Sequence, residues 1–146
     1  MKAELKGYYC ITREVGEPFD LDGWLPDDPE DFDLTIDFYI GAEGSEALDA
    51  FTIRACSPKR FFREAGKAIS VATHVLFMEH FDGPAIKNYI EEECAKLEGE
   101  VWEQLALRLH DIGCWELIRH AVLTPRIPTP YQELQKQRLT GKPPTS

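Results

Sequence analysis

The chain has no run of apolar residues long enough to cross a lipid bilayer. Its longest uncharged stretch, AISVATHVLFM at residues 68–78, is shorter than the roughly 20 residues that a transmembrane helix needs, so we expect a buried core segment there. The N-terminal residues, MKAELKGYYCITREV, lack the apolar centre and the small-residue cleavage site of a secretion signal. We therefore expect a cytoplasmic protein with no membrane partner.

Closely spaced cysteine and histidine residues are also missing. The four cysteines lie far apart with no CxxC pair, a usage typical of a reducing compartment rather than of a disulfide framework. His74 and His80 are six positions apart on a predicted strand, about 20 Å at strand rise, so they cannot share one metal ion by themselves. Without HExxH, CxxC or a His–Cys cluster, we expect no zinc site. A Cys–His nucleophilic pair stays open, because such partners need not be near in sequence.

No motif of an enzyme or of a phosphate-binding loop is present. The chain contains neither GxGxxG nor GxxxxGKS/T. Its many carboxylates are strung along a proline-broken loop, where we expect them to be solvated and ionised, whereas acid–base catalysis needs one carboxyl in an apolar pocket. A calcium loop starting at Asp20 would need Gly at its sixth position and Glu at its twelfth, but these are Leu25 and Asp31. We therefore expect no enzyme activity, no cofactor and no metal site.

Basic residues are absent from one quarter of the chain. Residues 14–49 contain thirteen of the 26 acidic residues and neither Lys nor Arg, and the whole chain has a formal net charge of −10. This balance argues against nucleic acid and against an anionic membrane as partners, because both are bound through clustered Lys and Arg. Crowded like charges repel one another, so the pattern indicates either a solvated surface or a docking surface for a strongly basic partner. The candidate partner-binding acids are Asp20, Asp22, Asp27, Asp28, Glu30, Asp31, Asp33 and Asp37.

Alternation of apolar and polar residues predicts the first three strands. Residues 5–15 alternate weakly, whereas FDLTIDFYI at residues 32–40 places five apolar side chains on one face and two carboxylates on the other. FTIRAC at residues 51–56 alternates again after a GAEGS turn, so we expect it to pair antiparallel with residues 32–40. Arg54 could then face Asp33 or Asp37 across the pair.

Capping residues predict where the helices begin and end. Ser and Pro at residues 57–58 start a short helix that ends near Gly66. Its KRFFR segment is expected to balance the acid-rich, proline-broken loop before residue 32, called the acidic loop below. DGP at residues 82–84 starts a longer helix with apolar residues at helical spacing. A second long helix is expected at residues 100–112, with Gly113 as its left-handed C-cap.

The order of the predicted elements indicates the fold class. Residues 71–81 are apolar on both faces, so we expect a central strand covered on both sides, and CWELI at residues 114–118 is expected as a last strand. Strands first and helices later predict an α+β fold, with a mainly antiparallel sheet of about four to five strands and two longer helices and one short helix packed on it. The length of 146 residues fits one domain, expected at residues 1–123, followed by a proline-rich basic tail at residues 124–146 with a short helical turn near its middle.

The second half of the chain contains the most characteristic motif, EGEVWEQLALRLHDIGCWELI. A helix opens with the acidic-flanked Trp102 and closes a few turns later on the pair Trp115 and Glu116. Before it come, in order, FTIRACSP, a short helix, a strand that ends in FD, and a helix that carries Ile86 and Ile90. In these features the chain resembles the immunity protein 8 family of bacterial polymorphic toxin systems. The resemblance covers residues 51–118 and leaves out the acidic loop and the tail.

This resemblance implies an α+β domain that binds and neutralises a toxin encoded beside it. Many such toxins are nucleases with basic clefts, so the expected partner is a basic C-terminal toxin domain, which the acidic surface would attract. Trp24 in the acidic loop is then an anchor for the partner, unless it folds back onto the core. Trp102 and Trp115 are expected as core anchors, and Glu116 as the partner of a buried backbone or Arg group.

Two other classes of function stay open at this point. A small cytoplasmic enzyme or cation-binding protein could use the clustered carboxylates with a metal ion, and it would be stabilised thermally by that metal. A housekeeping interaction subunit would bind another protein without any toxin. The neighbouring gene distinguishes the second alternative from an immunity protein, because an immunity protein should be encoded immediately beside a large toxin gene.

Overall fold

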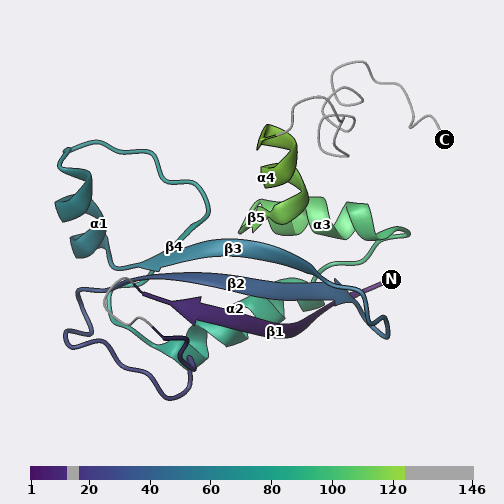
Figure 1. Ribbon diagram of the computed structural model, residues 1–146, viewed down its shortest axis with the longest axis horizontal. Coiled ribbons are helices and arrows are strands. Elements are labelled where there is room, and N and C mark those ends of the chain that lie inside the picture. Colours follow the sequence, from purple (N-terminus) through teal and green to yellow (C-terminus); the bar gives the residue numbers. More distant parts are fainter. Residues whose placement is uncertain (13–16, 124–146) are drawn as a thin grey trace.

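A mixed sheet lies at the centre of the computed structural model, which describes residues 1–12 and 17–123 (Figure 1). The strands in this part of the chain are β1 (Ala3–Ile11), β2 (Asp33–Ala42), β3 (Asp49–Cys56), β4 (Val75–Phe77) and β5 (Cys114–Trp115). Their order is β1-β2-β3-β4, and β5 shares the outer edge of β3 with β4. The first three strands are antiparallel, β4 runs parallel to β3, and β5 pairs antiparallel with it. The sheet is therefore mainly antiparallel, as predicted.

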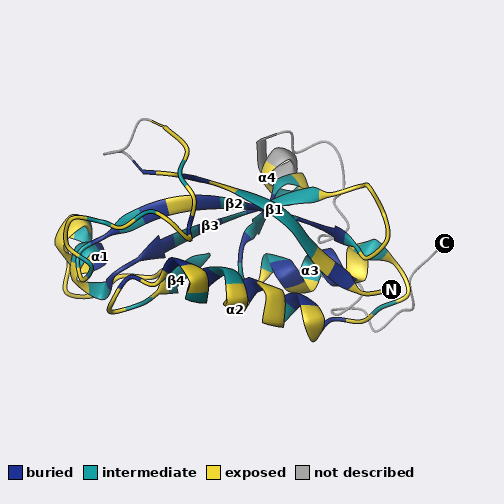
Figure 2. Ribbon diagram, turned by 90° about the horizontal axis from the view of Figure 1, so that it is seen from below, coloured by how far each residue is buried: buried dark blue, intermediate teal, exposed yellow. Residues whose placement is uncertain are grey.

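Helices cover one face of this sheet more fully than the other. The helices of the described residues are α1 (Pro58–Ala65), α2 (Gly83–Ala95), α3 (Trp102–His110) and α4 (Glu116–Leu123). Figure 2 shows α2 and α3 on the same side of the sheet. Buried residues of these two helices belong to one core cluster with those of the strands. The α+β class is confirmed, with α4 as a helix that was not predicted.

The alternation at residues 32–40 is confirmed and builds the core. Its apolar side chains are at most 2 % exposed, and the polar positions between them face the other side of the sheet. The antiparallel register places Ile36 opposite Ile53 and Phe38 opposite Phe51, so β3 continues the same apolar face. Burying an aliphatic or aromatic side chain of this size contributes about 1.5–3 kcal/mol, which makes this face the main source of stability. The buried apolar residues of the segment are Phe32, Leu34, Ile36, Phe38 and Ile40.

The predicted helix starts are also confirmed. The Ser57 side chain accepts a hydrogen bond from the Arg60 N–H at 3.2 Å, and Gly66 ends α1 in the left-handed region with φ of 63°. The Asp82 carboxylate accepts from the Ala85 N–H at 3.1 Å and caps α2. These caps satisfy backbone N–H groups that have no partner within a helix, and each contributes about 1 kcal/mol.

The segment at residues 68–78 differs from its prediction. The expected central strand at residues 71–81 is reduced to the three residues of β4 at the edge of the sheet, and Ile69 and Val71 are 86 % and 90 % exposed. The outer edge of β3 pairs with β5 near Phe51 and with β4 only near its C-terminal end, so a longer central strand has no place beside it. His74, at a φ of 57°, also turns the chain out of the extended conformation just before β4. The predicted core segment is therefore largely a surface segment.

Two predictions near the end of the domain are also wrong. Gly113 does not have a positive φ, and Asp111 caps α3 in the right-handed region. Gly113 instead permits a close backbone approach, because an added Cβ would lie 3.3 Å from the Thr52 carbonyl oxygen. The strand expected at residues 114–118 ends after Trp115, since β5 has only Phe51 and Thr52 of β3 to pair with, and α4 begins at the next residue. The tail predicted at residues 124–146 lies outside the described residues.

The contact between the acidic loop and the start of α2 yields a stability prediction. In Gly83→Ala the new Cβ would lie 1.8 Å from the Leu21 carbonyl oxygen, so the backbone of one segment must move. We expect a loss of at least about 1–3 kcal/mol in the free energy of unfolding, the usual cost of overpacking, measured by urea denaturation. Gly23→Ala is the matched control, because nothing lies within 4 Å of its added Cβ. Equal stability of the two variants would contradict this contact.

Candidate functional site

The acidic loop, defined here as residues 17–31, is attached to the core through its apolar side chains. Leu21 is 1 % exposed, and the half-buried Trp24 stacks on Phe19 at 4.4 Å and meets Phe81 edge-on at 5.2 Å between ring centroids. The Phe81 N–H also donates to the Pro29 carbonyl oxygen at 2.7 Å. The loop therefore has a fixed course along the domain, and Trp24 folds back onto the core. A contact of Trp24 with a partner stays a prediction.

Asp20 is held at the start of this loop by hydrogen bonds. Its carboxylate accepts from the Tyr8 hydroxyl at 2.6 Å and from the Asp22 backbone N–H at 2.9 Å. These two bonds lower the pKa of Asp20 below its usual value, with Lys87 adding a weaker attraction. Burial and the bond to Asp20 raise the pKa of Tyr8 to about 12. Asp20 is thus an ionised carboxylate with a structural contact inside the chain.

Asp31, at the other end of the acidic loop, binds two arginines of α1. Its carboxylate accepts from Arg60 Nε at 2.5 Å and from Arg63 Nη2 at 2.8 Å, with Arg63 Nη1 also in contact. These bonds hold the pKa of Asp31 well below its usual range and raise the pKa of Arg63. The sequence prediction that the KRFFR segment balances the acidic loop is confirmed at this pair.

Asp33 forms the second ion pair with an arginine. Its two carboxylate oxygens accept from Arg54 Nε at 2.9 Å and from Arg54 Nη2 at 2.7 Å, which confirms the predicted pair. Arg54 lies directly opposite Thr35 in the register, so the contact is diagonal across the strands. Glu64 links the two ion pairs, because it lies 3.3 Å from Arg54 and 3.5 Å from Arg60. We name this connected set of Asp31, Asp33, Arg54, Arg60, Arg63 and Glu64 the arginine network.

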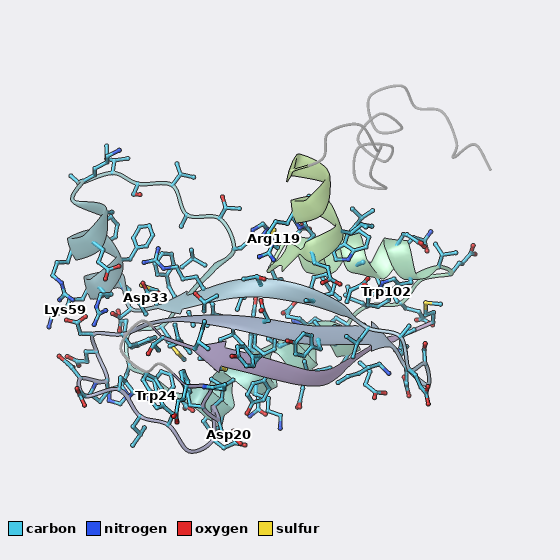
Figure 3. The ribbon with its side chains drawn as sticks, viewed as in Figure 1. Asp20, Trp24, Asp33, Lys59, Trp102 and Arg119 are labelled. Carbon is cyan, nitrogen blue, oxygen red and sulfur yellow. The ribbon has the colours of Figure 1, made fainter. Side chains whose placement is uncertain are left out.

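The remaining candidate acids fall into two groups. Asp37 is half-buried on the sheet and accepts from the Thr52 hydroxyl at 2.5 Å. The other four are exposed. Among the described residues, only Asp28 of these four has an ion pair, with Lys59 of α1 at 3.9 Å, and such a surface pair contributes little. Lys59 is labelled beside α1 in Figure 3. The four exposed acids of the loop are Asp22, Asp27, Asp28 and Glu30.

The tryptophan motif lies away from the acidic loop. Trp115 is 1 % exposed and stacks on Phe51 with ring centroids 6.3 Å apart, while Trp102 is half-buried at the start of α3. Both indole N–H groups donate to one oxygen of Asp49, at 2.7 Å from Trp102 and 3.1 Å from Trp115. Sequence reasoning missed this role of Asp49, which depends on strand register. Glu116 begins α4, where a carboxylate is favoured by the helix dipole.

A histidine pair is a second feature that sequence reasoning missed. The rings of His74 and His110 lie 4.7 Å apart, and His74 Nε2 donates to the His110 carbonyl oxygen at 2.7 Å. His110 Nδ1 accepts from the Trp115 backbone N–H at 3.1 Å, and burial together with His74 lowers the pKa of His110. The pair joins the residue before β4 to the last residue of α3.

Two further features concern the described residues, 1–12 and 17–123: metal ligands and membrane spans. No group of three or more His, Cys, Asp and Glu side chains there is arranged to hold a metal ion. No helix there has the length and apolar character that a membrane span requires.

Comparison with known protein families identifies a relationship. A protein-family model described as Immunity protein 8 matches residues 9–118, three quarters of the chain. The match includes the acidic loop, which the resemblance seen in the sequence left out. Neither the curated proteins nor the solved structures contain a match.

The arginine network predicts a pH-dependent contribution to stability. Because the pKa of Asp31 is lowered in the folded state, its stabilising effect is present above the ordinary aspartate pKa of about 3.9 and is lost as the pH falls toward the folded-state value. Asp31→Asn should therefore lower the urea midpoint at pH 7, and its difference from the parent protein should shrink below about pH 4. Asp27→Asn, on the same loop and exposed, serves as the control and should change little. A pH-independent difference for Asp31→Asn would contradict the ion pairs.

The carboxylate of Asp49, shared by two indole N–H groups, predicts a second effect on stability. Asp49→Ala leaves the indole N–H groups of Trp102 and Trp115 without this acceptor, and an unsatisfied buried donor costs about 1–3 kcal/mol. Asp49→Asn keeps one acceptor oxygen and should lose less. Urea unfolding followed by tryptophan fluorescence measures both variants. Equal losses would show that the carboxylate oxygen is not the acceptor that matters.

Proposed function

The chain belongs to the immunity protein 8 family, and we propose that it binds and neutralises the toxin domain encoded beside it through the exposed carboxylates of the acidic loop. The family match over residues 9–118 carries the first part of this proposal, because members of the family are immunity proteins of toxin systems. The geometry of the acidic loop supports the second part, which concerns the surface and the chemistry of the partner.

Charge is the property that favours a basic partner. The chain has a formal net charge of −10, and Asp22, Asp27, Asp28 and Glu30 project from one loop into solvent. Clustered charges of one sign raise the rate at which an oppositely charged protein finds the surface. A nuclease is the class of toxin that fits best, since its substrate cleft must be basic in order to bind phosphate. The acidic loop would then occupy or cover that cleft.

The arginine network distinguishes acids that bind arginines of the same chain from acids that are exposed to a partner. Asp31 and Asp33 already bind arginines of the same chain, so we assign them to holding the loop against α1 and β3. The exposed acids keep their charges available to a partner, with Asp20 beside them. Trp24 is half-buried, so its remaining exposed edge can add apolar contact next to these charges. A loop that is already ordered loses less conformational entropy on binding than a mobile one.

Charge neutralisation tests this assignment. The triple variant Asp22→Asn, Asp27→Asn and Glu30→Gln removes three exposed charges of the loop. We expect its association rate with the full toxin domain to fall about tenfold at low salt, with a smaller difference at 0.15 M and above, because salt screens exposed charges over about 8 Å. Stopped-flow or surface-binding kinetics at several salt concentrations give the measurement.

The matched control changes the same net charge elsewhere. Glu91→Gln, Glu92→Gln and Glu103→Gln neutralise three exposed carboxylates of α2 and α3. This control should bind the toxin nearly as fast as the parent protein. Equal slowing of both triple variants would assign the effect to net charge rather than to the loop. Failure of the parent protein to bind its neighbouring toxin would refute the proposed function.

A further inference from the structure

The longest uncharged stretch of the sequence, residues 68–78, lies largely on the surface. Residues 66–74 form the connection from α1 to β4, which stands away from the sheet in Figure 1, and they carry Ile69 and Val71 at 86 % and 90 % exposure. Phe77 of β4 is also 44 % exposed. Large apolar side chains that stay exposed on neighbouring segments make this part of the domain a candidate surface for another protein.

β4 offers main-chain hydrogen-bonding groups along this surface. In the described part of the chain, β4 pairs only with β3, so its other side is a free edge. The His74 carbonyl oxygen accepts from the Arg54 N–H at 3.0 Å, and the Met78 N–H donates to the Cys56 carbonyl oxygen at 3.3 Å. Peptide groups of a strand point alternately to its two sides, so the N–H and C=O groups of Val75 and Phe77 point away from β3.

A groove of about 670 Å³ runs beside this free edge. Its walls come from β4, from Ala85, Ile86 and Tyr89 on α2, and from Asp111 and Ile112 after α3. Of the described residues that line it, Asp111 is the one carboxylate, and most of the others are apolar. A groove between an edge strand and a helix fits an extended peptide, which pairs with the strand and directs alternate side chains toward the helix.

The sequence of β4 lacks the features that usually protect an edge. Natural sheets discourage strand addition with lysine, proline, inward charges or a bulge on the edge strand. β4 is Val75-Leu76-Phe77, with none of these, and it follows an exposed apolar connection. This edge is therefore open to pairing.

We propose that the free edge of β4 and the groove beside it receive an extended segment of the toxin, which pairs with Val75 and Phe77 as an added strand. This inference rests on the proposed function and names the surface that gives the complex its specificity. The segment carries apolar residues at alternate positions, to meet the groove and Phe77, and a basic residue that reaches Asp111.

Charge favours the toxin over a second copy of this chain as the occupant. The acidic loop is bonded to the residues just after β4, through the Phe81 N–H and the Pro29 carbonyl oxygen at 2.7 Å. Two copies paired through β4 would bring two acidic loops of a −10 chain toward each other, and like charges repel. A basic toxin docked at the acidic loop lies next to β4 without this repulsion.

Amide hydrogen exchange on the full chain, with and without the toxin domain, tests the pairing directly. We expect the Val75 and Phe77 amides to exchange at least about tenfold more slowly in the complex, because they acquire hydrogen bonds there. The Leu76 and Met78 amides already face β3 and should be protected in both states, so they serve as internal controls. A complex that leaves the Val75 and Phe77 amides unchanged overturns the strand pairing while the proposed function stands. If no complex forms, both fail.

A pair of substitutions at Phe77 gives an independent measurement. Phe77→Pro removes the outward N–H and keeps the ladder with β3, and the extended Leu76 before it is compatible with proline. Phe77→Ala loses the same ring, including its contact with Phe61, but keeps the N–H. We expect Phe77→Pro to bind the toxin at least about tenfold more weakly than Phe77→Ala, since a hydrogen bond and its geometry are lost. Equal affinities of the two folded variants, checked by thermal unfolding, would overturn the pairing.

Discussion

The bond between Asp31 and the two arginines of α1 is the interaction on which the arrangement of this domain depends. A loop with many carboxylates and no cation of its own repels itself, and it can be ordered only if charge arrives from elsewhere. Arg60 and Arg63 of α1 supply that charge, although they lie about thirty positions later in the chain than Asp31. Asp31 leads directly into β2, and α1 follows β3. The register pairs Asp33 with Cys56, so the end of the loop and the start of α1 lie at the same end of the sheet, and the bond joins them there. The bond also explains how the acidic loop, despite its many carboxylates, can precede β2 without disrupting that strand.

The same bond separates structural acids from exposed ones. Asp31 and Asp33 are neutralised within the chain, and the apolar side chains of Leu21 and Trp24 fix the rest of the loop to the core. The exposed carboxylates then stand on an ordered support rather than on a mobile chain. Their mutual repulsion weakens the free protein, and the approach of a basic surface relieves it. In the proposed complex, part of the binding free energy is this relief.

Local chemistry explains what could be predicted from the sequence. The alternation before Ile40, the Ser57 and Asp82 caps and the Arg54–Asp33 pair all depend on residues close in sequence or on one strand pairing. What could not be predicted depends on the distant course of the chain. The apolar composition of residues 68–78 predicts burial, but it does not reveal whether the sheet has room beside β3 to cover the segment. Asp49 resembles any other carboxylate of its region until the register brings two indoles to it.

Two kinds of interaction with different ranges meet at one end of the domain. Carboxylates of the acidic loop act over several ångströms and attract any basic protein, so they raise the rate of association but discriminate poorly between toxins. Main-chain pairing at β4 acts only at contact and requires a segment of suitable shape and side-chain pattern, so in the proposed complex it determines which partner stays bound. The hydrogen bond between Phe81 and Pro29 places the two surfaces next to each other. A toxin can thus be captured by charge and then retained by pairing, and salt would slow its capture while leaving its release largely unchanged.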